Sequence, residues 1–199
     1  MTISTDSTGP AARDAARAAR GPISRADAQL TALILGFFGG MWFNWGQQGA
    51  PAGWSGPLLA ASLLSFAVAV LGGVNTWRWR RELTTARDRA ASRRYGIIVG
   101  LSYLVLFVGA IALGRADRPE YIAPWVAFVI GAHFWALIPV LRDRAVLIPL
   151  GAVVVAVAGA AVALHAANGV QPSAVTGPGA GLALLVVAVL ELLRRRPAA

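Results

Sequence analysis

Six long apolar blocks, nearly free of charge, constrain this chain more than any other feature of its sequence. A helix needs about 20 such residues to cross the roughly 30 Å hydrocarbon core of a bilayer. A transmembrane β-strand would instead alternate in hydrophobicity over about ten residues. We therefore predict an all-α, polytopic membrane protein, a bundle of six transmembrane helices within residues 29–193. The predicted spans are 29–47, 57–76, 95–114, 121–141, 145–166 and 177–193.

The amino-acid composition is typical of a membrane protein and excludes several kinds of functional site. Hydrophobic residues make up 57% of the chain and charged residues 14%, whereas soluble domains average about 45–50% and about 25%. The chain has no Cys, which excludes disulfides, Cys-ligated metals and a thiol nucleophile. Two histidines, His133 and His165, are too few for a His-rich metal site. We predict no metal, no cofactor and no catalytic site.

The arginines predict how the helices are oriented. All 18 basic residues are Arg, and 16 of them fall in the two tails, the second loop and the fourth loop. The other two, Arg115 and Arg118, lie beside Asp117 and Glu120 in the third loop. By the positive-inside rule both termini are cytoplasmic. The absence of Lys and the bias toward Ala, Gly and Val suggest a GC-rich bacterial genome, and so a bacterial cytoplasmic membrane.

The segments outside the bundle are basic. Residues 1–28 are predicted to be a disordered, Arg-containing cytoplasmic arm, and residues 194–199 a short basic tail. The net charge of +9 follows from topology, so we expect no nucleic-acid partner. In loop 77–94, the arginines would contact anionic lipid headgroups or a cytoplasmic protein partner. They include Arg78, Arg80, Arg81, Arg87 and Arg89.

Polar residues inside the predicted spans are the candidate functional groups, because polar groups in hydrocarbon are costly. His133 lies in the fourth span, and imidazole binds and releases a proton near neutral pH. Asn44, Tyr103 and Trp135 are the other residues we place near a binding site or pathway. The alternative for His133 and Asn44 is a structural role, in which each bonds a neighbouring helix.

Small residues and prolines predict packing and bending. Gly36 and Gly40, and likewise Gly96 and Gly100, are spaced by four, which lets two helix backbones approach closely. Gly131 is a further packing candidate. Such faces can serve contacts within one chain or between copies, so a homo-oligomer is one interpretation. Pro139, inside the fourth span, is a candidate hinge.

Part of the chain carries a recognisable series of motifs. They are Tyr95-Gly96-Ile97-Ile98, Pro119-Glu120-Tyr121-Ile122 with Pro124, Val129-Ile130-Gly131-Ala132-His133-Phe134, Leu137 and Arg142-Asp143. Residues 94–154 thereby resemble a family of uncharacterised bacterial six-helix membrane proteins with a G-x-H-F motif in the fourth helix. The family often has an acidic residue where this chain reads Leu101-Ser102-Tyr103, and a Pro nearer the His-Phe pair than Pro139. The resemblance brings no known activity with it.

Three hypotheses of function follow. The first is a small transporter or channel-like protein with a pathway near His133, and two inverted halves of three spans each would suit it. The second is a non-transporting membrane subunit that docks a cytoplasmic partner through loop 77–94. The third is a membrane-embedded enzyme, for which the sequence offers no nucleophile or acid–base pair.

Overall fold

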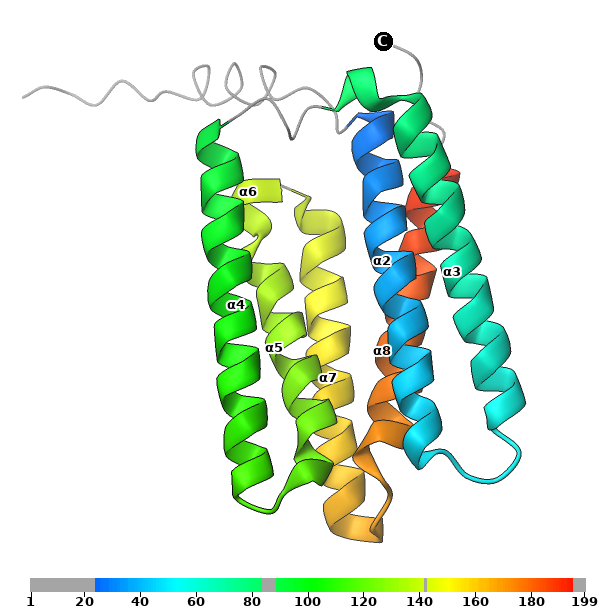
Figure 1. Cartoon of the computed structure of the whole chain (residues 1–199), viewed down its shortest axis with the longest axis vertical. Coiled ribbons are helices and arrows are strands. Elements are labelled where there is room, and N and C mark those ends of the chain that lie inside the picture. The colour runs from blue at the N-terminus through cyan, green and yellow to red at the C-terminus, as the bar shows by residue number, and fades with distance from the viewer. Residues whose placement is uncertain (1–23, 84–88, 142, 195–199) are drawn as a thin grey trace, which may run out of the picture.

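The computed structural model describes residues 24–83, 89–141 and 143–194, with side chains at all of these except 89–91. Six helices in this part of the chain are long and apolar enough to cross a membrane, which confirms the predicted all-α, multi-pass architecture. They run side by side along the long axis of the molecule (Figure 1). The main helices are α2 (Arg25–Gly46), α3 (Ser55–Arg78), α4 (Arg89–Arg115), α5 (Ile122–Ala136), α7 (Arg144–Asn168) and α8 (Pro172–Leu193).

Short elements extend or link these helices. They are η1 (Gln47–Gly49), η2 (Arg80–Glu82), η4 (Pro119–Tyr121) and α6 (Ile138–Leu141). Each spanning segment includes the apolar block predicted for it and begins up to five residues earlier. At α8 the reason is local, since Pro172 occupies the first helical turn, where its missing N–H costs no helix hydrogen bond.

The first helix begins earlier than we predicted. Residues 25–28 were assigned to the cytoplasmic arm, but they form the first turn of α2. Ser24 caps this turn, because its hydroxyl oxygen accepts the backbone N–H of Asp27 at 3.1 Å. Ala26 and Ala28 are buried, so this turn belongs to the packed bundle. Residues 1–23 and 195–199 of the two predicted tails lie outside the described residues.

The helices form two groups that meet along a seam. Helices α2, α3 and α8 pack together, and α5 packs between α4 and α7. Helix α8 makes most of the contacts between the groups, chiefly with α7. Leu184 of α8 and Val154 of α7 are among the largest fully buried side chains. The grouping therefore differs from a division into spans one to three and four to six, because α4 and α8 each pack with the other half.

Glycines set the closest helix contacts inside the groups. A Cβ atom on Gly36 would lie 2.9 Å from backbone atoms of Ser65 and Ala69 on α3. A Cβ atom on Gly40 would lie 2.7 Å from the Phe66 ring, also on α3. Glycine at these positions lets the two backbones approach to a distance that any side chain would prevent.

The contact between α5 and α7 has the same character. A Cβ atom on Gly131 would meet the carbonyl oxygen of Gly151 at 3.0 Å, and one on Gly151 would meet the carbonyl oxygen of Gly131 at 2.8 Å. The two helices therefore cross backbone to backbone at these two residues.

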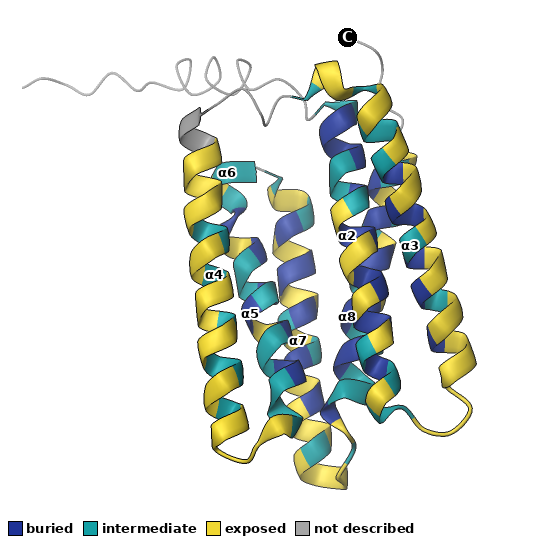
Figure 2. Ribbon diagram, viewed as in Figure 1, coloured by how far each residue is buried: buried dark blue, intermediate teal, exposed yellow. Residues whose placement is uncertain are grey.

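Helix α4 lies at the edge of the bundle, and Figure 2 shows it largely exposed. None of its spanning window is buried. Gly96 and Gly100 have no atom within 4 Å of an added Cβ, so they contact no other helix in the described chain. Apolar surface on a spanning helix that lacks a protein neighbour contacts lipid. That these two glycines pack against a second copy of the chain stays a prediction.

The fourth span is interrupted near Pro139. Helix α5 ends at Ala136, and the short α6 follows from Ile138 to Leu141. Proline lacks the N–H that would continue the helix, and its ring crowds the preceding turn. The interruption is thus where the sequence predicts it, and its use as a hinge stays a prediction.

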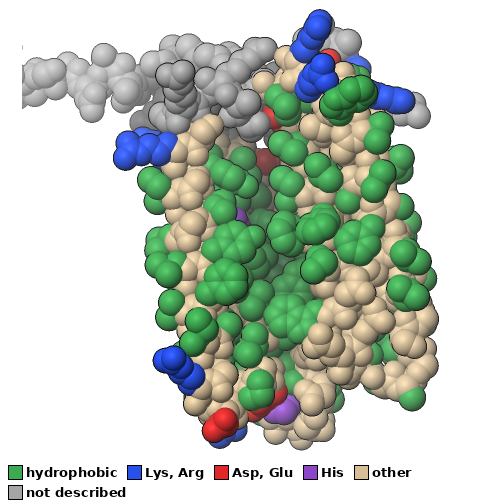
Figure 3. Space-filling model, viewed as in Figure 1, with side chains coloured by type: hydrophobic (Ala, Val, Ile, Leu, Met, Phe, Trp, Pro, Cys, Tyr) green, Lys and Arg blue, Asp and Glu red, His purple; other side chains and the backbone are tan. Residues whose placement is uncertain are grey.

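The two ends of the bundle differ in charge. We call the end that carries Arg25, Arg78, Arg80, Arg81 and Arg194 the basic end, and the other the opposite end. The face in Figure 3 is hollowed between the two helix groups, and hydrophobic side chains line the hollow. A polar contact between Arg194 and Asp143 crosses the seam at the basic end.

Candidate functional site

His133 lies on α5 and contacts α4. Its Nδ1 atom is 2.9 Å from the Ser102 hydroxyl oxygen. The same hydroxyl donates to the backbone carbonyl of Ile98 at 2.8 Å, within α4. The histidine is only partly buried. Ser102, rather than the adjacent Tyr103, is therefore the partner that α4 offers to the imidazole.

These contacts favour the imidazole tautomer that carries its proton on Nδ1. A serine hydroxyl has one hydrogen to donate, and Ser102 directs it to Ile98. Its oxygen then accepts from Nδ1–H of His133, which leaves Nε2 as a lone-pair acceptor. Among the described residues Nε2 has no hydrogen-bond partner. The imidazole can therefore accept a proton or a hydrogen bond from water or a ligand.

Asn44 lies in the other helix group and bonds α3. Its Nδ2 atom donates to the Ser62 hydroxyl at 2.7 Å and to the Gly40 carbonyl at 3.0 Å. The Ser62 hydroxyl in turn donates to the Gly40 carbonyl at 3.1 Å. These three residues link α2 to α3 just beyond the close contact at Gly36 and Gly40. Asn44 thus has the interhelical hydrogen bond that the structural alternative predicts.

The remaining two candidates of the predicted pathway, Trp135 and Tyr103, contact other neighbours. Trp135 donates its indole N–H to the Ile148 carbonyl on α7 at 3.1 Å. Tyr103 is 41% exposed on α4 and stacks on Phe107. The four residues His133, Asn44, Tyr103 and Trp135 therefore face different neighbours and are not assembled into one site.

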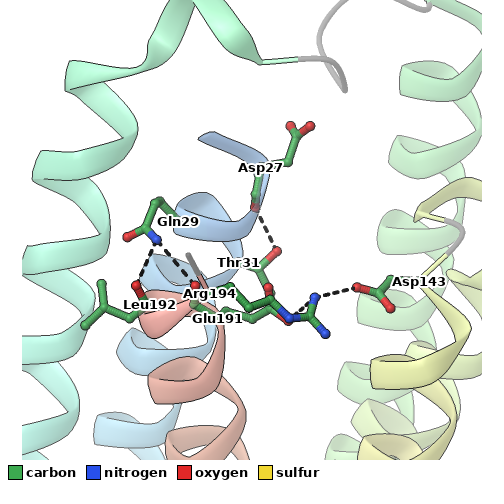
Figure 4. A network of polar contacts seen from close by, with 7 residues as sticks. All are labelled: Asp27, Gln29, Thr31, Asp143, Glu191, Leu192 and Arg194. Carbon is green, nitrogen blue, oxygen red and sulfur yellow. Dashed lines mark hydrogen bonds and ion pairs between the residues drawn. The ribbon is translucent and has the colours of Figure 1, made fainter. Parts of the chain in front are cut away.

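At the basic end, charged groups cross the seam. Arg194, at the end of α8, lies 2.8 Å from the Glu191 carboxylate and 3.4 Å from the carboxylate of Asp143, just before α7. Figure 4 shows the guanidinium between these two carboxylates. Glu191 is only 2% exposed. Glu191 and Arg194 are three residues apart, so their pairing is local, whereas the link to Asp143 depends on how the groups pack.

An amide holds the neighbouring ends of α2, α3 and α8. Gln29 is 3% exposed and donates to the carbonyls of Glu191 and Leu192 at 3.3 and 3.1 Å (Figure 4). Asn75 of α3 donates to the Gln29 side-chain carbonyl at 3.0 Å. Gln29 thereby donates to two carbonyls of the last turn of α8, and the Glu191 carbonyl also accepts from the Arg194 backbone N–H at 3.4 Å. We did not select Gln29 or Asn75 from the sequence, although an amide near the end of an apolar span was a usable signal.

At the opposite end, a cavity of about 340 Å³ lies between the two groups. Trp45 of α2, Gln48 of η1 and Ser173 of α8 line it, together with Gln171 just before α8 and Glu120 of η4. Among the described residues that line it, none is basic. No set of three or more His, Asp or Glu residues in the described ranges could hold a metal ion. Sequence reasoning missed this cavity, because its residues come from distant parts of the chain.

The predicted basic surface is described only in part. Arg78, Arg80 and Arg81 are exposed at the basic end. The Arg80 guanidinium lies 5.4 Å from the centre of the Trp77 ring, within cation–π range. Residue 87 and the side chain of residue 89 lie outside the described part of the chain.

Comparison of the chain with known protein families, with curated proteins and with solved structures finds no match. The resemblance of residues 94–154 to the six-helix family with a G-x-H-F motif is thus not supported by a family match. The chain is therefore described by its architecture, that of an integral membrane protein with six candidate spans.

Proposed function

We propose that the protein is a small transporter or channel-like protein in which the two helix groups move relative to each other across the seam. The observation that carries this proposal is the difference between the two ends of the seam. At the basic end Arg194 joins α8 to Asp143, whereas at the opposite end the groups leave a cavity. A transporter that alternates access closes one end of its pathway while the other is open.

The arginines orient this pathway. Positively charged residues near spans favour the cytoplasm, so the basic end would be cytoplasmic in a bacterial plasma membrane. The cavity beside Trp45 and Glu120 would then open toward the outside. The ion-paired end would be the closed, inner end of the pathway.

His133 provides a polar group within the α4–α5–α7 group. Its Nε2 lone pair has no partner among the described residues, and the side chain is only partly buried. An intramembrane histidine is costly unless it is bonded or hydrated. Water at this position would supply the missing partner and would mark the pathway.

Cysteine labelling tests the proposal directly, because the natural chain has no Cys to interfere. Single cysteines would replace His133, Phe128 and Leu137, and a membrane-impermeant thiol reagent would be added to intact cells and to inverted vesicles. We expect labelling at 133 only. Phe128 is an exposed apolar control and Leu137 a buried control on the same span. Absence of labelling at 133 from both sides, in an inserted and folded protein, would refute a hydrated pathway there.

The docking subunit is a second candidate function, favoured by the exposed Arg78, Arg80 and Arg81. The guanidiniums of Arg78 and Arg80 lie at the surface, where anionic headgroups or an acidic partner could reach them. Replacing Arg80, Arg81, Arg87 and Arg89 together by Ala should release such a partner from purified membranes without changing labelling at position 133. Unchanged co-purification of associated proteins would count against docking through this loop.

A further inference from the structure

The cavity at the opposite end combines features that select one class of ligand. Glu120 supplies a carboxylate, Trp45 an aromatic ring, and Gln48, Gln171 and Ser173 supply neutral hydrogen-bonding groups. No basic side chain from the described ranges lines the cavity. We propose that this cavity binds a small organic cation, such as an alkylammonium ion.

The nearest counter-ion leaves the Glu120 carboxylate available. Arg118 lies 3.8 Å from it, and the Arg118 side chain is 65% exposed while that of Glu120 is 23% exposed. Long ion pairs between solvated groups contribute little, because water screens them and the long side chain loses freedom. An ammonium group in the cavity can therefore compete with Arg118 for the carboxylate.

The aromatic wall favours an organic cation over a bare metal ion. Indole is the side chain whose ring face attracts cations most strongly. One face of Trp45 is braced by Trp42, with ring centres 5.2 Å apart and planes inclined by 16°. Ca²⁺ and Mg²⁺ instead require about six oxygen ligands, usually with several carboxylates. In the part of the chain that the structure describes, Glu120 is the only carboxylate that lines this cavity.

The position of the cavity relates the ligand to movement. Its walls belong to both helix groups, with Trp45 and Gln171 on one side of the seam and Glu120 and Ala123 on the other. A ligand that contacts both walls favours the arrangement in which they are close. Transport of the cation across the membrane rests on the proposed function. Binding of the cation in the cavity does not depend on it.

Binding would be measured with the purified protein in lipid nanodiscs by isothermal titration calorimetry, with choline as the probe. The neutral isostere 3,3-dimethylbutan-1-ol is the matched ligand control. Glu120→Gln removes the charge and keeps the side-chain size. Asp117→Asn makes the same change on the neighbouring turn, outside the cavity. Thermal unfolding of each variant would show that it is folded, and Trp45→Leu provides a second variant that leaves the carboxylate in place.

We expect choline to bind, the isostere to bind at least about tenfold more weakly, and Glu120→Gln and Trp45→Leu each to weaken choline binding by about tenfold. Asp117→Asn should change the affinity by less than about twofold. Equal binding of choline and the isostere, equal effects of Glu120→Gln and Asp117→Asn, or tighter binding of Ca²⁺ than of choline would each overturn the proposal. Choline binding without labelling at position 133 would refute the hydrated pathway but support the cation site. Labelling at position 133 without choline binding would refute the cation site but support the pathway.

Discussion

The substitution Gly36→Ala tests a close backbone contact between α2 and α3. The added Cβ would lie 2.9 Å from a backbone nitrogen and a backbone oxygen of α3. Ordinary contacts of a Cβ begin at about 3.4 Å, so the two helices must separate by about half an ångström. Backbone atoms cannot rotate away as a flexible side chain can, and the strain therefore spreads along the whole α2–α3 interface.

The cost can be estimated from two opposing effects. Forcing an extra methyl group into a close contact costs about 1–3 kcal/mol, including lost dispersion energy along the interface. Replacing Gly by Ala inside a helix contributes about 1 kcal/mol in the favourable direction. Gly100→Ala isolates the second effect, because position 100 has the same glycine spacing on α4 and no atom within 4 Å of an added Cβ. The difference between the two variants should therefore be about 1–3 kcal/mol.

The free energy of unfolding would be measured by reversible unfolding in mixed micelles, followed by tryptophan fluorescence and by circular dichroism. We expect Gly36→Ala to be less stable than Gly100→Ala, and Gly100→Ala to match or exceed the natural protein. A difference below about 0.5 kcal/mol would refute the reasoning, because substitutions free of contacts normally fall within that range. If Gly100→Ala itself is destabilised, and more so at higher protein-to-detergent ratio, Gly100 packs against a second copy of the chain.

Three further predictions concern individual polar contacts. Asn44→Ala should lower the free energy of unfolding by roughly 0.6–2 kcal/mol, because an interhelical hydrogen bond of 2.7 Å is lost. An unchanged free energy of unfolding in the same micelle assay would show that this hydrogen bond does not stabilise the protein. Ser102→Ala removes the acceptor that holds the proton on Nδ1 of His133, so ¹⁵N NMR of the imidazole should change from one tautomer to a mixture, and an unchanged spectrum would contradict the assigned donor. Arg194→Gln should destabilise the protein by about 1–3 kcal/mol, because the Glu191 carboxylate that it pairs with is buried. Loss of the link to Asp143 should also speed hydrogen exchange in the first turn of α7. Arg118→Gln is the control and should have almost no effect on stability, because the Arg118 side chain is largely exposed.

The spanning helices were predictable from the sequence, because the bilayer requires long apolar segments. The thickness of the hydrocarbon core sets the length of a span, so continuous apolar blocks predict all six spanning helices. Local chemistry added detail at Pro139, where the fourth span is interrupted. One local prediction was wrong, because residues 25–28 extend the first helix where a disordered arm was expected.

The spacing of small residues did not predict which faces pack. Gly36 with Gly40 and Gly96 with Gly100 share one spacing, yet the first pair lies against α3 and the second contacts nothing in the described chain. In the same way, Ser102 contacts His133 whereas the adjacent Tyr103 lies on an exposed face of α4. Sequence position alone could not distinguish the members of either pair.

The sequence by itself determined that the chain forms six spanning helices and where most of them begin and end. The tertiary structure decided that α8 packs with α2 and α3, that Arg194 reaches Asp143, and that Glu120 and Trp45 line one cavity. The physical reason is the solvent. In water, burial separates apolar from polar faces and leaves a periodic pattern along a helix. In a bilayer, both lipid-facing and helix-facing surfaces are apolar, so partners are selected by shape and by a few hydrogen bonds that become visible only when the helices are packed.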